Sequence, residues 1–380
     1  MKIALKIVLI TIVAIIVLLL VSPSYLREAV LHGNAGIEDY KIFHNRVVKA
    51  GKGQDWQVAI DVNSYEFPDS IMGIIEGYDP IAFLVIQDEE IIYEEYWDGF
   101  NKNSLSNSFS AVKGIVSLLV GIAIDEGKIK SVDDKVGDYL PSFRSGSKKE
   151  LKIRNLLTMS SGLNWDESYS TPFSMTTKAY YGNDLPGLIN NLEVIEKPGK
   201  EYNYLSSDTE ILGMVVQAAT GKSISEYTSE KIWKQIGAQH DALWSLDSEN
   251  GMEKAYCCFN SNARDFARFG QLILNNGRWN GQQIVSEAYI HESTKPAYYL
   301  IDKEDREAVD FYGYHWWIIN YKGHEIPYMR GILGQYVFVI PELNAVIVRL
   351  GHDRSHEYID HHTLDIYQYL DAGFMVLDSR

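Results

Sequence analysis

Runs of β-branched and aromatic residues near both ends of the chain predict two β-hairpins. Residues 81–97 form two such runs separated by the polar residues 87–90, and residues 336–350 form two more separated by 341–344. Apolar runs of this length, broken by turn-forming residues, are typical of antiparallel strand pairs. We therefore predict that both terminal parts of the chain supply strands to one antiparallel sheet.

The middle of the chain has the spacing of apolar residues that is typical of helices. A nearly continuous apolar run at 115–124 predicts a helix buried between layers, and residues 210–220 and 264–275 predict two more. Residues 151–159 also look helical and end at a Ser-Ser-Gly turn. The fold class that we predict is α+β: an antiparallel sheet covered by helices, with a mainly helical lobe inserted.

The N-terminus has the pattern of a membrane-targeting segment. Lys2 and Lys6 precede an uncharged run at 7–21 that is rich in Ile, Val and Leu and approaches bilayer-spanning length. Flanking lysines stay in the cytoplasm, so the rest of the chain is expected on the extracytoplasmic side. Residues 22–24 are a poor processing site, which favours an uncleaved anchor; a cleaved signal peptide and a secreted protein are the alternative.

Composition narrows the possible functions. The chain has 380 residues, of which 46% are hydrophobic, so it can bury a large core. Its formal net charge of -16 and the absence of a basic block argue against nucleic acid as a partner. The only two cysteines, Cys257 and Cys258, are adjacent and are interpreted as two structural thiols.

Ser110 and Lys113 lie one helical turn apart at the start of the buried helix, and such a pair can make an activated nucleophile. Residues three apart share a helix face, so a neutral Lys113 amine can accept the Ser110 proton. Unpaired N–H groups at the helix start favour a developing oxyanion. The alternative is an N-cap serine beside an incidental lysine. The same spacing at Ser145 and Lys148 lies in a polar segment and is interpreted as a loop.

Other candidate chemistry in the sequence is weaker. The sequence contains no Gly-x-Ser-x-Gly elbow, no Walker loop and no complete His-Glu-x-x-His motif. Four histidines and two aspartates near the C-terminus lack a recognised ligand spacing, so we interpret them as a polar tail and expect neither a metal nor another cofactor. They are His352, His356, His361, His362, Asp353 and Asp360. Residues 164–186 form an aromatic, polar loop that either covers a site or packs as a local core.

Several segments together resemble the serine β-lactamase and penicillin-recognising hydrolase family, and in particular its class C, esterase and nylon-oligomer-hydrolase branch. They are the Ser110–Lys113 tetrad, residues 198–213 around Tyr204, residues 331–336, and the supporting stretches 154–162 and 264–270. The resemblance covers about residues 81–351. It implies a β-lactamase/transpeptidase-like fold.

The resemblance also implies roles for individual residues. Ser110 would be the acylated nucleophile, Lys113 its proton acceptor and Tyr204 the second acid/base group. In the family's Tyr-x-Asn element the asparagine is replaced by Ser206. The nylon-oligomer-hydrolase relatives share this departure, which disfavours β-lactam turnover. As a base, Lys113 needs a pKa lowered by about 3 units, or about 4 kcal/mol, through burial and its neighbours.

The family's third element, usually Lys-Thr-Gly or His-Thr-Gly, reads Met329-Arg330-Gly331 here. The oxyanion hole that the resemblance implies would use the backbone N–H groups of Ser110 and Ile332, and Gly331 suits the close backbone approach. Arg330 is a candidate for binding a substrate carboxylate. The alternative is that this strand residue points to the other face of the sheet.

We therefore expect a membrane-tethered serine hydrolase that acts on a small ester, amide or peptide through an acyl-enzyme, as an esterase or amidase. A D-alanyl peptidase and a β-lactamase are alternatives with the same machinery, and a non-catalytic wall-ligand binder or sensor is the alternative from another class. The expected division of the chain is an anchor or signal at 1–24, an irregular lead-in at 25–75, a β-lactamase-like hydrolase domain at 76–365 and a C-terminal tail at 366–380.

Overall fold

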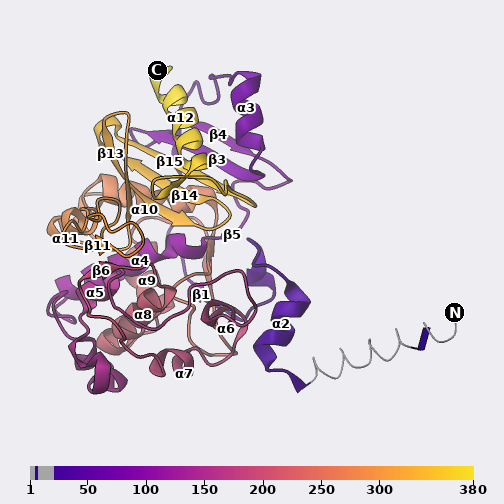
Figure 1. Ribbon diagram of the computed structural model, residues 1–380. Helices are drawn as coiled ribbons and strands as arrows, with labels where there is room; N and C mark the ends of the chain where they lie inside the picture. The colour runs from indigo at the N-terminus through magenta and orange to yellow at the C-terminus, as the bar shows by residue number, and fades with distance from the viewer. Residues whose placement is uncertain (1–4, 7–20) are drawn as a thin grey trace.

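A seven-stranded sheet forms the upper half of the protein (Figure 1). The computed structural model describes residues 5–6 and 21–380. The strand order is β12 (Trp317–Tyr321), β13 (His324–Gly331), β14 (Gln335–Ile340), β15 (Ala345–Gly351), β3 (Pro80–Gln87), β4 (Glu90–Tyr96) and β2 (Gln57–Val58). Both predicted hairpins are confirmed, β3 with β4 and β14 with β15. The sheet is antiparallel as predicted except for β2, which pairs with β4 in parallel.

Helices cover both faces of this sheet, so its central strands are buried on both sides. Alternate residues of β3 enter different cores: Leu84 and Ile86 pack on one face, and Phe83 and Val85 on the other. The first face is covered by α10 (Ala263–Leu274), and the second by α12 (Leu364–Asp378) and α3 (Asp69–Glu76). The predicted α+β architecture is confirmed.

The lower half is the predicted helical lobe, and α4 (Val112–Asp125) lies between it and the sheet (Figure 1). Every residue from Val112 to Ala123 is buried, as the continuous apolar run predicts. The lobe contains α5 (Ile153–Leu157), α6 (Met175–Tyr181), α7 (Leu185–Asn190), α8 (Ser206–Thr220) and α9 (Ile224–Thr228). A second sheet joins β1 (Asn45–Val48), β7 (Ala242–Ser245), β8 (Phe259–Ser261) and β5 (Ser106–Asn107).

Both ends of the chain are more regular than the sequence analysis predicts. The lead-in at 25–75 includes most of α2 (Ser24–His32), which packs on α6, and the strands β1 and β2. Short, half-exposed edge strands carry little periodic signal, which explains the error. The tail expected at 366–380 is also wrong, because these residues form most of α12 and bury Ile366, Leu370 and Phe374.

The N-terminal anchor predicted at 1–24 lies mostly outside the described residues. Among residues 5–6 and 21–380, no helix has both the length and the apolar character needed to cross a membrane.

Candidate active site

Ser110 lies in a short 3-10 turn, Phe109–Ala111, that leads directly into α4. Phe109 has a φ of 44°, in the left-handed region, so the chain turns sharply just before the serine. Ser108 and Ala111 occupy the N-cap positions of these two helical segments, so the N-cap interpretation of Ser110 is wrong. The turn leaves the Ser110 hydroxyl facing the end of the Lys113 side chain.

Lys113 is 1% exposed and donates to the Ser110 hydroxyl, with 3.0 Å between Nζ and Oγ. Its amine also donates to the Tyr256 carbonyl at 2.8 Å and approaches the Ser206 hydroxyl at 3.4 Å. Burial lowers the pKa of Lys113 to about 8, against the opposing effect of the carboxylates of Glu167, Asp208 and Glu210. A measurable fraction of this amine is therefore neutral near pH 7 and can accept a proton.

Glu167 is a site residue that the sequence analysis did not identify. Its carboxylate accepts hydrogen bonds from the Ser206 backbone N–H at 2.6 Å and from the Ser206 hydroxyl at 2.7 Å. The Trp165 indole donates to it at 2.8 Å. No pattern in the neighbouring sequence marks Glu167 as a site residue, because only the tertiary fold brings the loop at 164–186 to Ser206. The loop contributes to the site, as one of the two interpretations predicts.

Tyr204 precedes α8 and faces the same group of side chains. The Lys113 Nζ lies 5.2 Å from the centre of the Tyr204 ring, and the ring packs against Tyr312 and Trp317. Burial raises the pKa of Tyr204 above its ordinary value, while its interaction with the Ser110 hydroxyl lowers it. The phenol is therefore protonated at neutral pH and is available as a proton donor.

The end of β13 runs against the Ser110 turn. A Cβ atom on Gly331 would lie 2.2 Å from the Ser108 carbonyl oxygen, so only glycine permits this approach. Gly331 and Ile332 border a cavity that also contains Ser110. The Arg349 guanidinium fixes the turn that follows by donating to the carbonyls of Leu333 and Gly334, both at 2.8 Å.

Arg330 points to the other face of the sheet, as the alternative interpretation predicts, because it pairs with Tyr336 in the core under α12, whereas Met329 faces α4. It nevertheless lines the cavity that contains Ser110. Its guanidinium lies 4.4 Å from the centre of the Trp317 ring and donates to the His361 carbonyl at 2.8 Å. These contacts hold a cation at the wall of the cavity that also contains Ser110. A substrate carboxylate is a ligand of suitable charge for it.

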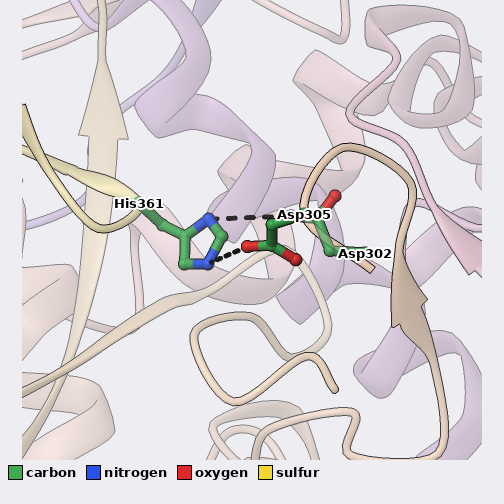
Figure 2. Close-up of side chains that lie close together, drawn as sticks. All are labelled: Asp302, Asp305 and His361. Atoms are coloured by element: carbon green, nitrogen blue, oxygen red, sulfur yellow. Dashed lines mark ion pairs between the residues drawn. The ribbon is translucent and has the colours of Figure 1, made fainter. Parts of the chain in front are cut away.

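A histidine between two aspartates lies at the rim of the same cavity (Figure 2). His361 faces Asp302 through Nδ1 at 3.6 Å and Asp305 through Nε2 at 3.1 Å. The donor atoms of the three residues lie within 4.8 Å of one another. Each of the two carboxylates faces a different nitrogen of the imidazole ring, and the three side chains form one polar group beside the cavity.

The polar-tail interpretation is therefore wrong for His361 and for His362, which belong to or adjoin the hairpin of β16 (Tyr358–Ile359) and β17 (His362–Thr363). His362 is buried and hydrogen-bonds through Nδ1 to the Tyr328 hydroxyl at 2.7 Å. Histidine spacing along the chain could not predict this, because each ring is placed by a partner distant in sequence.

Two cavities meet at Ser110. The first, here called the polar cavity, has a volume of about 400 Å³ and contains Tyr204, Arg330, Asp302 and His361. The second, here called the apolar cavity, has a volume of about 520 Å³. It extends from Ser110 to α2 and α6, and its wall includes Phe109, Pro172, Tyr181, Ala35 and Leu333.

Cys257 also borders the apolar cavity, and it forms a disulfide with Cys258. The interpretation of the two residues as thiols is therefore wrong. Cys258 has a φ of 71°, and this left-handed turn is a tertiary feature that the sequence does not reveal. The disulfide directly follows Tyr256, whose carbonyl accepts the hydrogen bond from Lys113.

Comparisons with known proteins show the family and the fold of this chain. The sequence profile described as Beta-lactamase matches residues 76–366. The 6-aminohexanoate-dimer hydrolase of Paenarthrobacter ureafaciens is 25% identical over 291 residues, which cover 71% of this chain and 72% of that protein.

Solved structures show the same fold. A family VIII carboxylesterase superposes with a TM-score of 0.64 at 17% identity, over 85% of this chain and 99% of its own. A D-stereospecific amidohydrolase from Streptomyces sp. superposes with a TM-score of 0.60 at 16% identity, over 81% and 99%. The resemblance inferred from the sequence is confirmed, and because the profile spans most of the chain, this protein belongs to the Beta-lactamase family, whose members similar to it include hydrolases.

Proposed function

We propose that the protein is a serine hydrolase that cleaves an ester or amide through an acyl-enzyme on Ser110. The observation that carries the proposal is the 3.0 Å contact between the Ser110 hydroxyl and the buried Lys113 amine, whose pKa is lowered to about 8. A nucleophile hydrogen-bonded to a base that is partly neutral at pH 7 is the arrangement that acyl transfer requires.

In the proposed reaction, neutral Lys113 accepts the Ser110 proton while Oγ attacks the substrate carbonyl carbon. The backbone N–H groups of Ser110 and Ile332 stabilise the oxyanion. The carbonyl re-forms as the bond to the leaving group breaks, and Tyr204 gives that group its proton. The Lys113 ammonium then returns a proton to the tyrosinate. A water molecule attacks the acyl-enzyme by the same route and releases the carboxylic acid.

Hydrogen bonds around this centre hold the groups that take part in the proposed reaction. Glu167 fixes Ser206, whose hydroxyl lies 3.4 Å from the Lys113 amine, and Arg349 fixes the turn that carries Ile332. The replacement of the family's asparagine by Ser206 favours an ester or linear amide over a β-lactam. The 6-aminohexanoate-dimer hydrolase similarity and the carboxylesterase fold agree with both amide and ester substrates.

Hydrolysis of p-nitrophenyl esters and p-nitroanilides by residues 25–380 tests the proposal. We expect turnover in the wild type and none above background in Ser110→Ala. A well-folded wild-type protein that hydrolyses none of these substrates would favour the non-catalytic binder or sensor instead. Turnover of a chromogenic cephalosporin faster than that of the esters would favour a β-lactamase, and release of D-alanine from a dipeptide-terminated substrate would favour a D-alanyl peptidase.

We also propose that the segment at 1–24 tethers the domain to the membrane on its extracytoplasmic side. The lysines that flank the apolar run support this orientation, and the Cys257–Cys258 disulfide is a bond that persists mainly outside the cytoplasm. The full chain should sediment with membranes. Protease added to intact spheroplasts should reach the domain and release it in soluble form. Recovery of a shortened chain in the medium would instead indicate a cleaved signal peptide.

A further inference from the structure

The two cavities that meet at Ser110 differ in chemistry. The polar cavity is bordered by charged groups, among them Arg330, Asp302 and Arg354. The apolar cavity is bordered by aromatic and aliphatic side chains together with serine and threonine hydroxyls, Asn34 and His356. None of the described residues that border it is an Asp, Glu, Lys or Arg. Both contain Ser110 and Ile332, the residues on which the proposed acyl transfer depends. A substrate bound at Ser110 can therefore place one part in each cavity.

The position of Tyr204 indicates which cavity receives the leaving group of the substrate and which receives its acyl group. Tyr204 borders the polar cavity, and it is not among the residues that border the apolar one. In the proposed reaction Tyr204 gives its proton to the leaving group, so the leaving group lies on the polar side. The acyl group that stays on the Ser110 oxygen then extends into the apolar cavity.

The far wall of the apolar cavity comes from a part of the chain outside the matched family profile. Ala29, Gly33 and Ala35 lie in and just after α2, whereas the profile begins at residue 76. The Tyr181 hydroxyl donates to the Gly33 carbonyl at 2.8 Å and joins this segment to α6. The hydrogen bond between Tyr181 and Gly33 therefore holds this wall in place, and the wall comes from a segment that precedes the matched residues.

We infer that the apolar cavity binds the acyl chain of the substrate, and that the substrate is an ester or amide of an apolar carboxylic acid of medium length with a polar leaving group. This inference rests on the proposed function and specifies its substrate class. A volume of about 520 Å³ lies within the range of small-molecule sites, and it accommodates a chain of several methylenes.

A series of p-nitrophenyl esters from acetate to octanoate tests the inference in residues 25–380. Each buried methylene should raise kcat/KM by up to about fourfold, which corresponds to about 0.8 kcal/mol, until the cavity is full. A matched series of acetate esters with alcohols of increasing alkyl length should show no such rise, because that part lies in the polar cavity. Equal slopes for the two series, or a rise only for the alcohols, would overturn the assignment.

A cavity-filling variant tests the position of the chain. In Ala35→Phe the rise should stop at a shorter acyl chain than in Ala218→Phe, a control on the exposed face of α8. If Ser110 is required for hydrolysis of the p-nitrophenyl esters but kcat/KM does not depend on acyl length, the inference is refuted and the proposed function stands. Absence of hydrolysis together with absence of fluorophosphonate labelling at Ser110 would refute both.

Discussion

The activity should rise with pH as Lys113 loses its proton. With a pKa of about 8, the neutral fraction of this amine is about 1% at pH 6, about 9% at pH 7 and about half at pH 8. Because only the neutral amine accepts the Ser110 proton, kcat/KM should increase about fifty-fold between pH 6 and pH 8 and level off above pH 9. An unperturbed lysine, with a pKa of 10.5, would give a rise that continues past pH 10.

The assay is the initial rate of p-nitrophenyl ester hydrolysis at low substrate, read at the isosbestic wavelength of p-nitrophenol so that its own ionisation does not contribute. Ser110→Ala gives the background at each pH. A flat profile between pH 6 and pH 9, or one that keeps rising to pH 10, would refute the reasoning, since neither is compatible with a base of pKa about 8.

A second variant tests the electrostatic origin of this profile. The Glu167 carboxylate raises the pKa of Lys113, so Glu167→Gln should lower that pKa and move the midpoint of the pH profile to more acidic values. Glu304→Gln, which removes an exposed carboxylate at the polar cavity, is the matched control and should leave the midpoint in place. A midpoint that stays unchanged or moves to higher pH in Glu167→Gln would contradict the assignment.

Three further variants probe other parts of the site. Tyr204→Phe should lower kcat by about 10² to 10⁴ for anilides and by less for p-nitrophenyl esters, whose leaving group departs without a proton; equal losses would contradict its role. Gly331→Ala should reduce the free energy of unfolding in urea by on the order of 1–3 kcal/mol and reduce kcat, whereas Gly73→Ala, with open space around its Cβ, should be neutral or stabilising; similar effects would contradict the packing argument. Arg349→Met should lower kcat with little change in KM, and an unchanged kcat would show that this arginine does not position the turn.

Local patterns in the sequence predict the parts of the structure that depend on local spacing. The apolar run after Lys113 predicts a buried helix, and the one-turn spacing to Ser110 is retained as a 3.0 Å contact. The sequence analysis does not predict the helix α12, although a local pattern indicates it. Four buried apolar residues follow helical spacing there: Ile366, Tyr369, Leu370 and Phe374.

Features that depend on distant segments could not be predicted in this way. Glu167 reaches Ser206 across 39 residues, and the Arg330 guanidinium reaches the His361 carbonyl across 31. The wall that α2 adds to the apolar cavity depends on its packing against α6. Each of these contacts joins segments that the fold brings together, and the spacing of residues along the chain does not reveal which segments meet.

The most direct test of the central claim is the covalent trapping of Ser110. Residues 25–380 are incubated with a fluorophosphonate at pH 8, and the adduct is located by peptide mass in the wild type and in Lys113→Ala. The account predicts one adduct, on Ser110, formed at a rate that falls strongly in the variant. A folded protein without an adduct, an adduct on another serine, or equal labelling in both proteins would contradict it.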